Sequence, residues 1–404
     1  MTTGTASVTA PADSPALSAP RRAAALAVLT TTVFAVGTAE WVVVGLLPQL
    51  SAAWDRPLAA TGSLVTWYAL VVTVAGPLVT VLTLRLARRQ ALLALLGVFL
   101  AGNVAAALAG SFQALVAARM LTALTHSTAF AAALVLAVAT VPAGRRGRAI
   151  AVVTAGWNLA TVLGAPLGTW IGDHHGWRAT FWAIATLAAG VLCAVAVLVR
   201  PSAPRGDAGP GGEVRGVLRP RVALVLAVIV AAQAGLFTTY TYIAPLLRQV
   251  SGFGPSAVTT LLALFGVGAV AGNVLGGRLA ERAPWTGLCA ALTALAGVLA
   301  AFTATSQVRW AAAVTVLALG VIAATLIPLL QDRALAAAPA APTLVTAISA
   351  SAFNLGVAGG SQLGARSLDA GRGLADLPWT GALLACGAVL LAAATARRHR
   401  AVPQ

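Results

Sequence analysis

Two charged side chains lie inside long apolar stretches of the chain: Glu40 in the first stretch and Arg119 in the fourth. A charge at the depth of a lipid bilayer costs roughly 3 kcal/mol or more, so it persists where function or a partner compensates it. A carboxyl group can take up and release a proton, whereas a guanidinium keeps its charge. The pair is therefore the first candidate for a transport site.

The elements that must position this pair are membrane helices. Of the 404 residues, 59% are hydrophobic and 9% charged, and the mean hydropathy is +0.90, whereas soluble proteins carry roughly 25% charged residues. Each apolar stretch reaches the roughly 20 residues that a helix needs to cross the hydrocarbon layer, and lipid leaves the backbone no other hydrogen-bond partners. We predict an all-α membrane protein with twelve transmembrane helices, at about 23–47, 58–82, 91–110, 111–141, 149–171, 179–199, 222–247, 255–277, 284–306, 310–330, 342–365 and 377–396.

The basic residues predict the orientation of these helices. All 26 are Arg, and most fall on one side of the membrane when the N-terminus is placed in the cytoplasm. Short cytoplasmic loops are enriched in basic residues, so we expect both termini in the cytoplasm. Because the Arg residues are spread over short loops, the net charge of +16 does not indicate a nucleic-acid partner.

The two halves of the chain are similar to each other. Residues 158–168 (NLATVLGAPLG) match residues 354–364 (NLGVAGGSQLG), with Asn, Leu and Gly at corresponding positions. A parallel repeat of this kind is expected of a transporter built from two six-helix bundles. We predict a disordered cytoplasmic tail at 1–20, a first bundle at 21–199, a cytoplasmic linker rich in Pro, Gly and Arg at 200–220, a second bundle at 221–396 and a tail at 397–404.

Six segments carry a resemblance to a known family. They are FAVGTAEWVVVGLLPQL (34–50), WYALVVTVAGP (67–77), ARMLTALTHSTAF (118–130), GWNLATVLGAPLGTWIGDHHGWRATF (156–181), YTYIAPLLRQVSGF (240–253) and SAFNLGVAGG (351–360). Through them the sequence resembles the major facilitator superfamily, and within it the twelve-span drug:proton antiporters of the arabinose-efflux and chloramphenicol-resistance type. The resemblance covers 23–396. It implies a transporter that exports small molecules as protons flow inward, with Glu40 and Arg119 as the proton-coupling residues. The absence of Lys beside abundant Arg and Ala indicates a GC-rich bacterial genome, and hence an inner or plasma membrane.

The depths of these two residues are compatible with that role. At a rise of about 1.5 Å per residue, Glu40 lies roughly 7 to 8 Å and Arg119 roughly 9 to 10 Å outward of the middle of their helices. We expect both to face a central cavity, where burial favours the neutral carboxyl and the guanidinium favours the carboxylate. Hydration changes between open states could then switch protonation. A charge pair that only holds two helices together is the alternative.

Two further motifs concern gating. Gly164, Pro166 and Gly168 resemble the antiporter motif of the fifth helix, although Ala165 and Thr169 stand where it has glycines; packing and a kink are the alternative role. In the superfamily, the loop after the second helix carries a glycine, an acid and basic residues that latch the inward side. Here its candidates are Arg85, Arg88 and Arg89 and, after the eighth helix, Gly277, Arg278 and Glu281. The alternative is that the positive charges only keep these loops on the cytoplasmic side of the membrane.

Aromatic and polar side chains inside the predicted helices are candidates for substrate contact, because rings and amides bind organic molecules by stacking and hydrogen bonds. The candidates are Trp41, Trp67, Tyr68, His126, Gln233, Tyr240, Tyr242 and Asn354. Each could instead join two helices. A short cluster, Asp173, His174 and His175, lacks helical metal-ligand spacing, so we expect a solvated external turn and no metal site.

The sequence leaves several functions open. The substrate could be a chloramphenicol-like antibiotic, another drug, a sugar or a nucleoside. A sugar or metabolite importer or uniporter of the same fold, and a sensor that has lost transport, remain alternatives. An intramembrane enzyme would need paired acids or a Ser/His or Cys/His set, which one Glu and one distant His do not supply. We expect a monomer that needs no cofactor and whose partners are substrate, protons and lipid.

Overall fold

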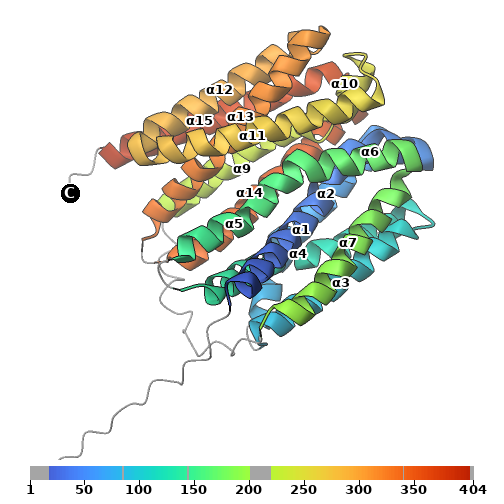
Figure 1. Ribbon diagram of the computed structural model, residues 1–404. Helices are drawn as coiled ribbons and strands as arrows, with labels where there is room; N and C mark the ends of the chain where they lie inside the picture. Colours follow the sequence, from blue (N-terminus) through green and yellow to red (C-terminus); the bar gives the residue numbers. More distant parts are fainter. Residues whose placement is uncertain (1–17, 84–85, 143–144, 201–219, 340, 401–404) are drawn as a thin grey trace, which may run out of the picture.

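The computed structural model describes residues 18–83, 86–142, 145–200, 220–339 and 341–400, and all regular elements in these ranges are helical (Figure 1). The elements are α1 (Ala19–Trp54), α2 (Leu58–Thr83), α3 (Arg88–Ala107), α4 (Phe112–Thr140), α5 (Arg146–Leu159), η2 (Ala160–Gly164), α6 (Ala165–His175), α7 (Trp177–Leu198), α9 (Pro220–Tyr240), α10 (Ile243–Gln249), α11 (Pro255–Arg282), α12 (Pro284–Thr305), α13 (Arg309–Ala337), α14 (Pro342–Asp369), η3 (Leu374–Asp376) and α15 (Leu377–Arg400).

The described residues form twelve helical spans that are long and apolar enough to cross a membrane, which confirms the predicted fold class. The segments α5, η2 and α6 make one span, and α9 and α10 make another. Helices α1 and α13 continue for two turns beyond their predicted ends, to Trp54 and Ala337, because hydropathy marks the part of a helix that lipid surrounds and not its last turns. Most of the predicted N-terminal tail (1–17) and of the linker (201–219), and half of the predicted C-terminal tail (401–404), lie outside the described residues.

The helices pack in two sets. In the first, α1 contacts α2, α4, α5, α6 and α7; in the second, α9 contacts α12, α13, α14 and α15. The sets meet where α2 packs on α14, where α11 packs on η2 and α6, and where α1 touches α10. Helix α1 begins and α15 ends at the same end of the molecule (Figure 1). We call this the termini end and the opposite one the far end.

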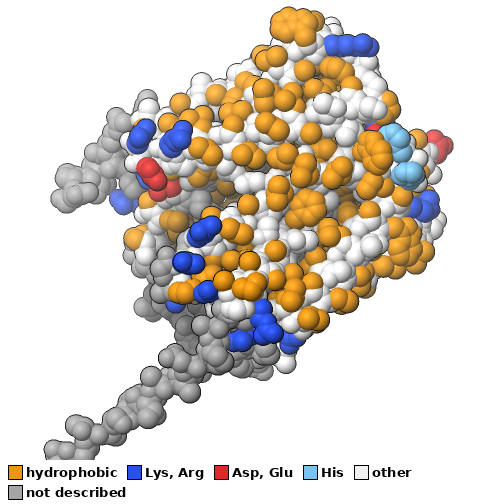
Figure 2. All heavy atoms as spheres, viewed as in Figure 1, with side chains coloured by type: hydrophobic (Ala, Val, Ile, Leu, Met, Phe, Trp, Pro, Cys, Tyr) orange, Lys and Arg blue, Asp and Glu red, His pale blue; other side chains and the backbone are white. Residues whose placement is uncertain are grey.

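The outer surface is suited to lipid. Figure 2 shows hydrophobic side chains across the middle of one face, with basic side chains near its ends. Large apolar residues such as Leu390, Val197 and Val314 are exposed on the surface of the molecule. A soluble protein rarely exposes apolar surface on this scale, so these side chains are suited to contact acyl chains.

Two prolines follow breaks in the regular α-helix. A proline has no N–H and its ring crowds the carbonyl four residues earlier. Before Pro166 the chain widens into the π-helical turn η2, in which the Ala165 N–H donates to the Ala160 carbonyl. Before Pro245 it breaks, so that α9 ends at Tyr240 and α10 begins at Ile243. Pro48, by contrast, lies inside the continuous helix α1.

Glycines on one face of α11 allow close contact with α13. Gly268, Gly272 and Gly276 recur every fourth residue, and a methyl group added at Gly268 would lie 2.6 Å from the Leu317 carbonyl oxygen of α13. The same overlap with α13 backbone would arise at Gly272 and Gly276. Small residues at this spacing bring membrane helices into backbone contact.

We expect Gly272→Ala to destabilise the protein by about 2 kcal/mol, because a methyl group forced into close packing must push α11 and α13 apart. Thermal unfolding of the detergent-solubilised protein, followed by size exclusion, measures the effect. Gly277→Ala is the matched control, since nothing lies within 4 Å of a methyl group at that position. Equal melting temperatures for the two variants would contradict the backbone contact.

Candidate functional site

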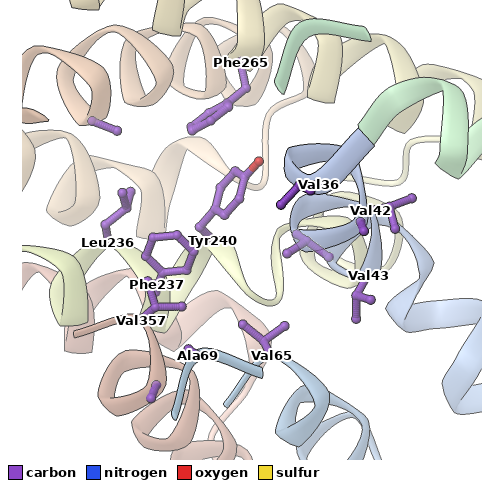
Figure 3. Packing of buried hydrophobic residues seen from close by; sticks show 14 of the residues in the cluster. Val36, Val42, Val43, Val65, Ala69, Leu236, Phe237, Tyr240, Phe265 and Val357 are labelled. Atoms are coloured by element: carbon purple, nitrogen blue, oxygen red, sulfur yellow. The ribbon is translucent and has the colours of Figure 1, made fainter. Parts of the chain in front are cut away.

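Glu40 and Arg119 line one small cavity deep among the helices. Its wall includes Glu40 and Trp41 of α1, Tyr68 of α2, Arg119 of α4, Phe237 of α9 and Val357 of α14. Figure 3 shows the apolar part of this wall, where Phe237 and Val357 lie beside Val65 and Ala69. The space open to the centre of a water molecule is about 10 Å³, which is room for about one water. The cavity is therefore nearly closed in this conformation.

Arg119 is held beside Glu40 without an ion pair between their side chains. Its Nη1 donates to the Ala39 carbonyl oxygen at 2.6 Å, and its Cζ lies 4.4 Å from the centre of the Tyr68 ring. Among the described residues, Glu40 Oε2 and Arg119 Nε are buried without a hydrogen-bond partner. The guanidinium therefore anchors the α1 backbone next to Glu40 and stacks on an aromatic face, a favourable place for a cation.

His126 connects the acid to Tyr68. Its Nε2 lies 4.0 Å from Glu40 Oε2, and its Nδ1 lies 3.0 Å from the Tyr68 hydroxyl oxygen, at hydrogen-bond distance. The ring also stands edge-on to Trp157 of α5, with centroids 5.2 Å apart. Because Arg119 and His126 are seven residues apart on α4, they share one face of that helix. The structure thus brings four ionisable side chains from α1, α2 and α4 together.

Aromatic rings from three helices cover the α9 side of the cavity. Trp41 stacks on Phe237 with centroids 5.6 Å apart and stands edge-on to Tyr240 at 6.0 Å. Tyr240 in turn lies 4.5 Å from Phe265 of α11. Sequence reasoning missed Phe237, although its spacing of three residues from Tyr240 puts both on one helix face. The cluster offers flat apolar surfaces next to the charged groups.

Four of the predicted substrate contacts do not line this cavity: Trp67, Gln233, Tyr242 and Asn354. Trp67 is 47% exposed. Gln233 packs against Gly356 of α14. The Tyr242 hydroxyl donates to the Ser361 carbonyl oxygen at 3.2 Å. The Asn354 amide donates within its own helix, to Ala350. Among the described candidates, Trp41, Tyr68, His126 and Tyr240 are those near Glu40 and Arg119.

The gating candidates occupy helix contacts and helix ends. Gly164 and Gly168 face α1, where added methyl groups would overlap Thr38 and Val42, so this stretch packs closely on the helix that carries Glu40. Arg88 begins α3, and Arg89 donates from its guanidinium to the Ala196 carbonyl oxygen of α7. Arg85 lies outside the described residues.

The second group of gating candidates does not lie in a loop. Gly277, Arg278 and Glu281 all belong to α11, which continues to Arg282. The sequence placed a loop there because hydropathy falls after about residue 277. A polar sequence with good helix formers can nevertheless continue a helix beyond the hydrocarbon layer.

The predicted solvated turn at residues 173–175 is a helix end, at which His174 and His175 are exposed but Asp173 is not. Asp173 lies in the last turns of α6 and its side chain is 8% exposed. Its Oδ1 accepts hydrogen bonds from Gln49 Nε2 of α1 at 2.7 Å and from Arg248 Nη2 of α10 at 2.8 Å. We call Gln49, Asp173 and Arg248 the far-end lock, because they join the two helix sets at the far end. The sequence carried no signal for it, since the partners are distant along the chain.

Comparisons with known proteins agree on one family. Residues 29–361 match the family model described as Major Facilitator Superfamily. The chain is similar to the "Inner membrane transport protein YdhP" of Escherichia coli K12, with 36% identity over 93% of this chain and 96% of the relative. It is 34% identical to a "Chloramphenicol resistance protein" of Streptomyces lividans, over 91% and 95% of the two chains. A "Probable sugar efflux transporter" of Mannheimia succiniciproducens is 30% identical over 90% and 91%.

Proposed function

Because this chain belongs to the Major Facilitator Superfamily, whose members are transporters and not enzymes, we propose that it exports a small organic molecule in exchange for protons. The protein is a multi-pass inner-membrane transporter. The direction of transport, the coupling to protons and the substrate class are the parts that we propose. Alternating access between the two helix sets would carry substrate and proton in turn.

One observation carries the proposal of proton coupling. The Glu40 side chain is 9% exposed, its Oε2 has no hydrogen-bond partner, and its cavity has room for about one water. A buried carboxyl group is more stable when neutral, and a hydrated one is more stable when ionised. Opening the cavity to water on either side therefore favours release of the proton, and closing it favours the protonated form.

The helix sets provide the moving parts of this cycle. We propose that residues 21–199 and 221–396 form two bundles that rock against each other, with both termini in the cytoplasm, in a monomer. The far-end lock would then lie on the outer side and hold it closed, because it ties α1 and α6 to α10. The contacts of Trp41 in the first set with Phe237 and Tyr240 in the second would lie between the moving bundles.

The lining of the cavity supports an uncharged or weakly polar organic substrate. Trp41, Phe237 and Tyr240 present ring faces and edges, which bind flat or amphipathic molecules. The relatives named for chloramphenicol resistance and for sugar efflux point to an amide-bearing antibiotic or a sugar. Both carry an apolar face and several hydrogen-bonding groups, which suits rings placed beside a carboxyl group and a guanidinium.

Transport in proteoliposomes tests this function. The purified protein is reconstituted with a pH-sensitive dye inside, and chloramphenicol or one member of a sugar panel is added to one side. We expect substrate to move against its gradient when a pH gradient is imposed, and substrate addition to move protons the opposite way. Substrate flux that does not depend on the pH gradient would support a uniporter instead. Substrate binding without flux would support a sensor.

A further inference from the structure

We propose that His126 is a proton-relay residue, which exchanges the coupling proton with Glu40, and that Tyr68 holds its ring for this step. The sequence offered His126 only as a substrate contact. The inference rests on the proposed proton antiport and adds a second proton carrier to it. Three features support it: the position of the imidazole, the engagement of Arg119 elsewhere, and the room for one water beside Glu40.

The imidazole lies between an acid and a phenol. Its Nε2 faces the Glu40 oxygen that has no hydrogen-bond partner, at 4.0 Å, and its Nδ1 lies 3.0 Å from the Tyr68 hydroxyl oxygen. A neutral imidazole has one N–H and one lone pair, so the hydrogen bond at Nδ1 decides which of the two Nε2 presents to Glu40. With Nδ1–H bonded to Tyr68, Nε2 is free to accept a proton from Glu40.

The groups that face His126 leave Glu40 as its proton partner. They are Glu40 from α1, Tyr68 from α2 and Arg119 from its own helix, while α5 contributes Trp157, which does not titrate. Arg119 donates to the Ala39 carbonyl and stacks on Tyr68, and makes no ion pair with Glu40 in the described structure. A guanidinium keeps its proton under all relevant conditions. The acid and the imidazole are therefore the groups here that can exchange a proton.

The proton moves from the carboxyl group of Glu40 to the imidazole of His126. When Nδ1–H donates to the Tyr68 oxygen, the Nε2 lone pair faces the protonated carboxyl group of Glu40. The carboxyl O–H bond breaks as an Nε2–H bond forms, which leaves a carboxylate and an imidazolium. A water between the two atoms would accept the carboxyl proton and donate another to Nε2. The small cavity beside Glu40 has room for about one water, although His126 is not part of its wall. The imidazolium then gives the Nε2 proton to water when the site hydrates, and neutral His126 is restored.

The test compares His126→Asn with wild type in two assays on the same proteoliposomes. Asn keeps a hydrogen-bonding group near the Nδ1 position but cannot carry a proton. We expect pH-gradient-driven transport to fall at least about tenfold and its pH profile to flatten. Substrate exchange at equal pH on both sides, which needs no net proton movement, should stay within about twofold of wild type.

Two further variants distinguish loss of the relay from misfolding. Tyr68→Phe keeps the ring under Arg119 and loses the hydroxyl on Nδ1, so it should weaken driven transport in the same direction while exchange persists. Trp157→Phe keeps an aromatic ring against His126 and should behave as wild type. Equal loss of exchange and driven transport in His126→Asn would assign His126 to substrate binding or folding and overturn the relay. Full pH-driven transport by His126→Asn would also overturn the relay. Absence of pH-driven transport in wild type would reject the antiport proposal itself.

Discussion

Glu40→Gln is expected to lower pH-gradient-driven transport roughly 100-fold, the scale on which removal of a positioned proton-transfer group acts. The amide has the shape and the hydrogen-bonding capacity of the neutral carboxyl, but it cannot release a proton. The buried position, among Trp41, Tyr68 and Arg119, should accept it without loss of fold. Uptake into proteoliposomes under an imposed gradient measures the effect, and the remaining transport should no longer respond to the size of the gradient.

Exchange of labelled for unlabelled substrate at equal pH separates coupling from binding. Glu40→Gln should retain it, because the variant resembles the protonated state permanently. Asp332→Asn is the control: it makes the same acid-to-amide change in α13, at a side chain that is 39% exposed and paired with Arg333, and should leave both assays unchanged. A Glu40→Gln protein that still follows the gradient would remove Glu40 from the coupling step.

Asp173→Asn is expected to shift the protein toward conformations that are open at the far end, by roughly tenfold in population. Loss of the carboxylate leaves the Arg248 guanidinium without its charged partner, and a hydrogen bond to a charged group is worth about 1.5 to 3 kcal/mol. Since the Arg248 side chain is 19% exposed, water compensates part of this loss. A difference of about 1.4 kcal/mol corresponds to tenfold in an equilibrium.

Spin labels at Ala52→Cys on α1 and Ser256→Cys on α11 report the shift, because both positions are exposed at the far end, one on each helix set. The three native cysteines, Cys193, Cys289 and Cys386, are first replaced by Ser. Pulsed electron paramagnetic resonance should show a larger population at long distance in Asp173→Asn.

Two further variants make this result specific to the far-end lock. Arg248→Gln should act in the same direction as Asp173→Asn, and the double variant should add little to either, because both changes remove one interaction. Asp376→Asn changes an acid of η3 that accepts from the Gly373 N–H and should not shift the distances. Identical distance distributions in wild type and Asp173→Asn would show that the lock does not control the far end.

The sequence by itself determined the helices, because a bilayer allows few solutions. Lipid cannot satisfy backbone polar groups, so each long apolar stretch must be a helix, and the structure confirms all twelve. The same physics singled out Glu40 and Arg119, since a charge is conspicuous where lipid would surround it. Local chemistry also indicated the bend at Pro166, although the π-helical turn before it was not foreseen.

Only the tertiary structure decided which side chains meet. Trp67 and Tyr68 are adjacent and both aromatic, yet Trp67 is about half exposed and Tyr68 lines the cavity, because successive residues on a helix point about 100° apart. The contacts of Glu40 with His126 and of Asp173 with Arg248 join segments that are far apart along the chain. Such pairs depend on how the helices rotate and pack against each other, which hydropathy does not encode.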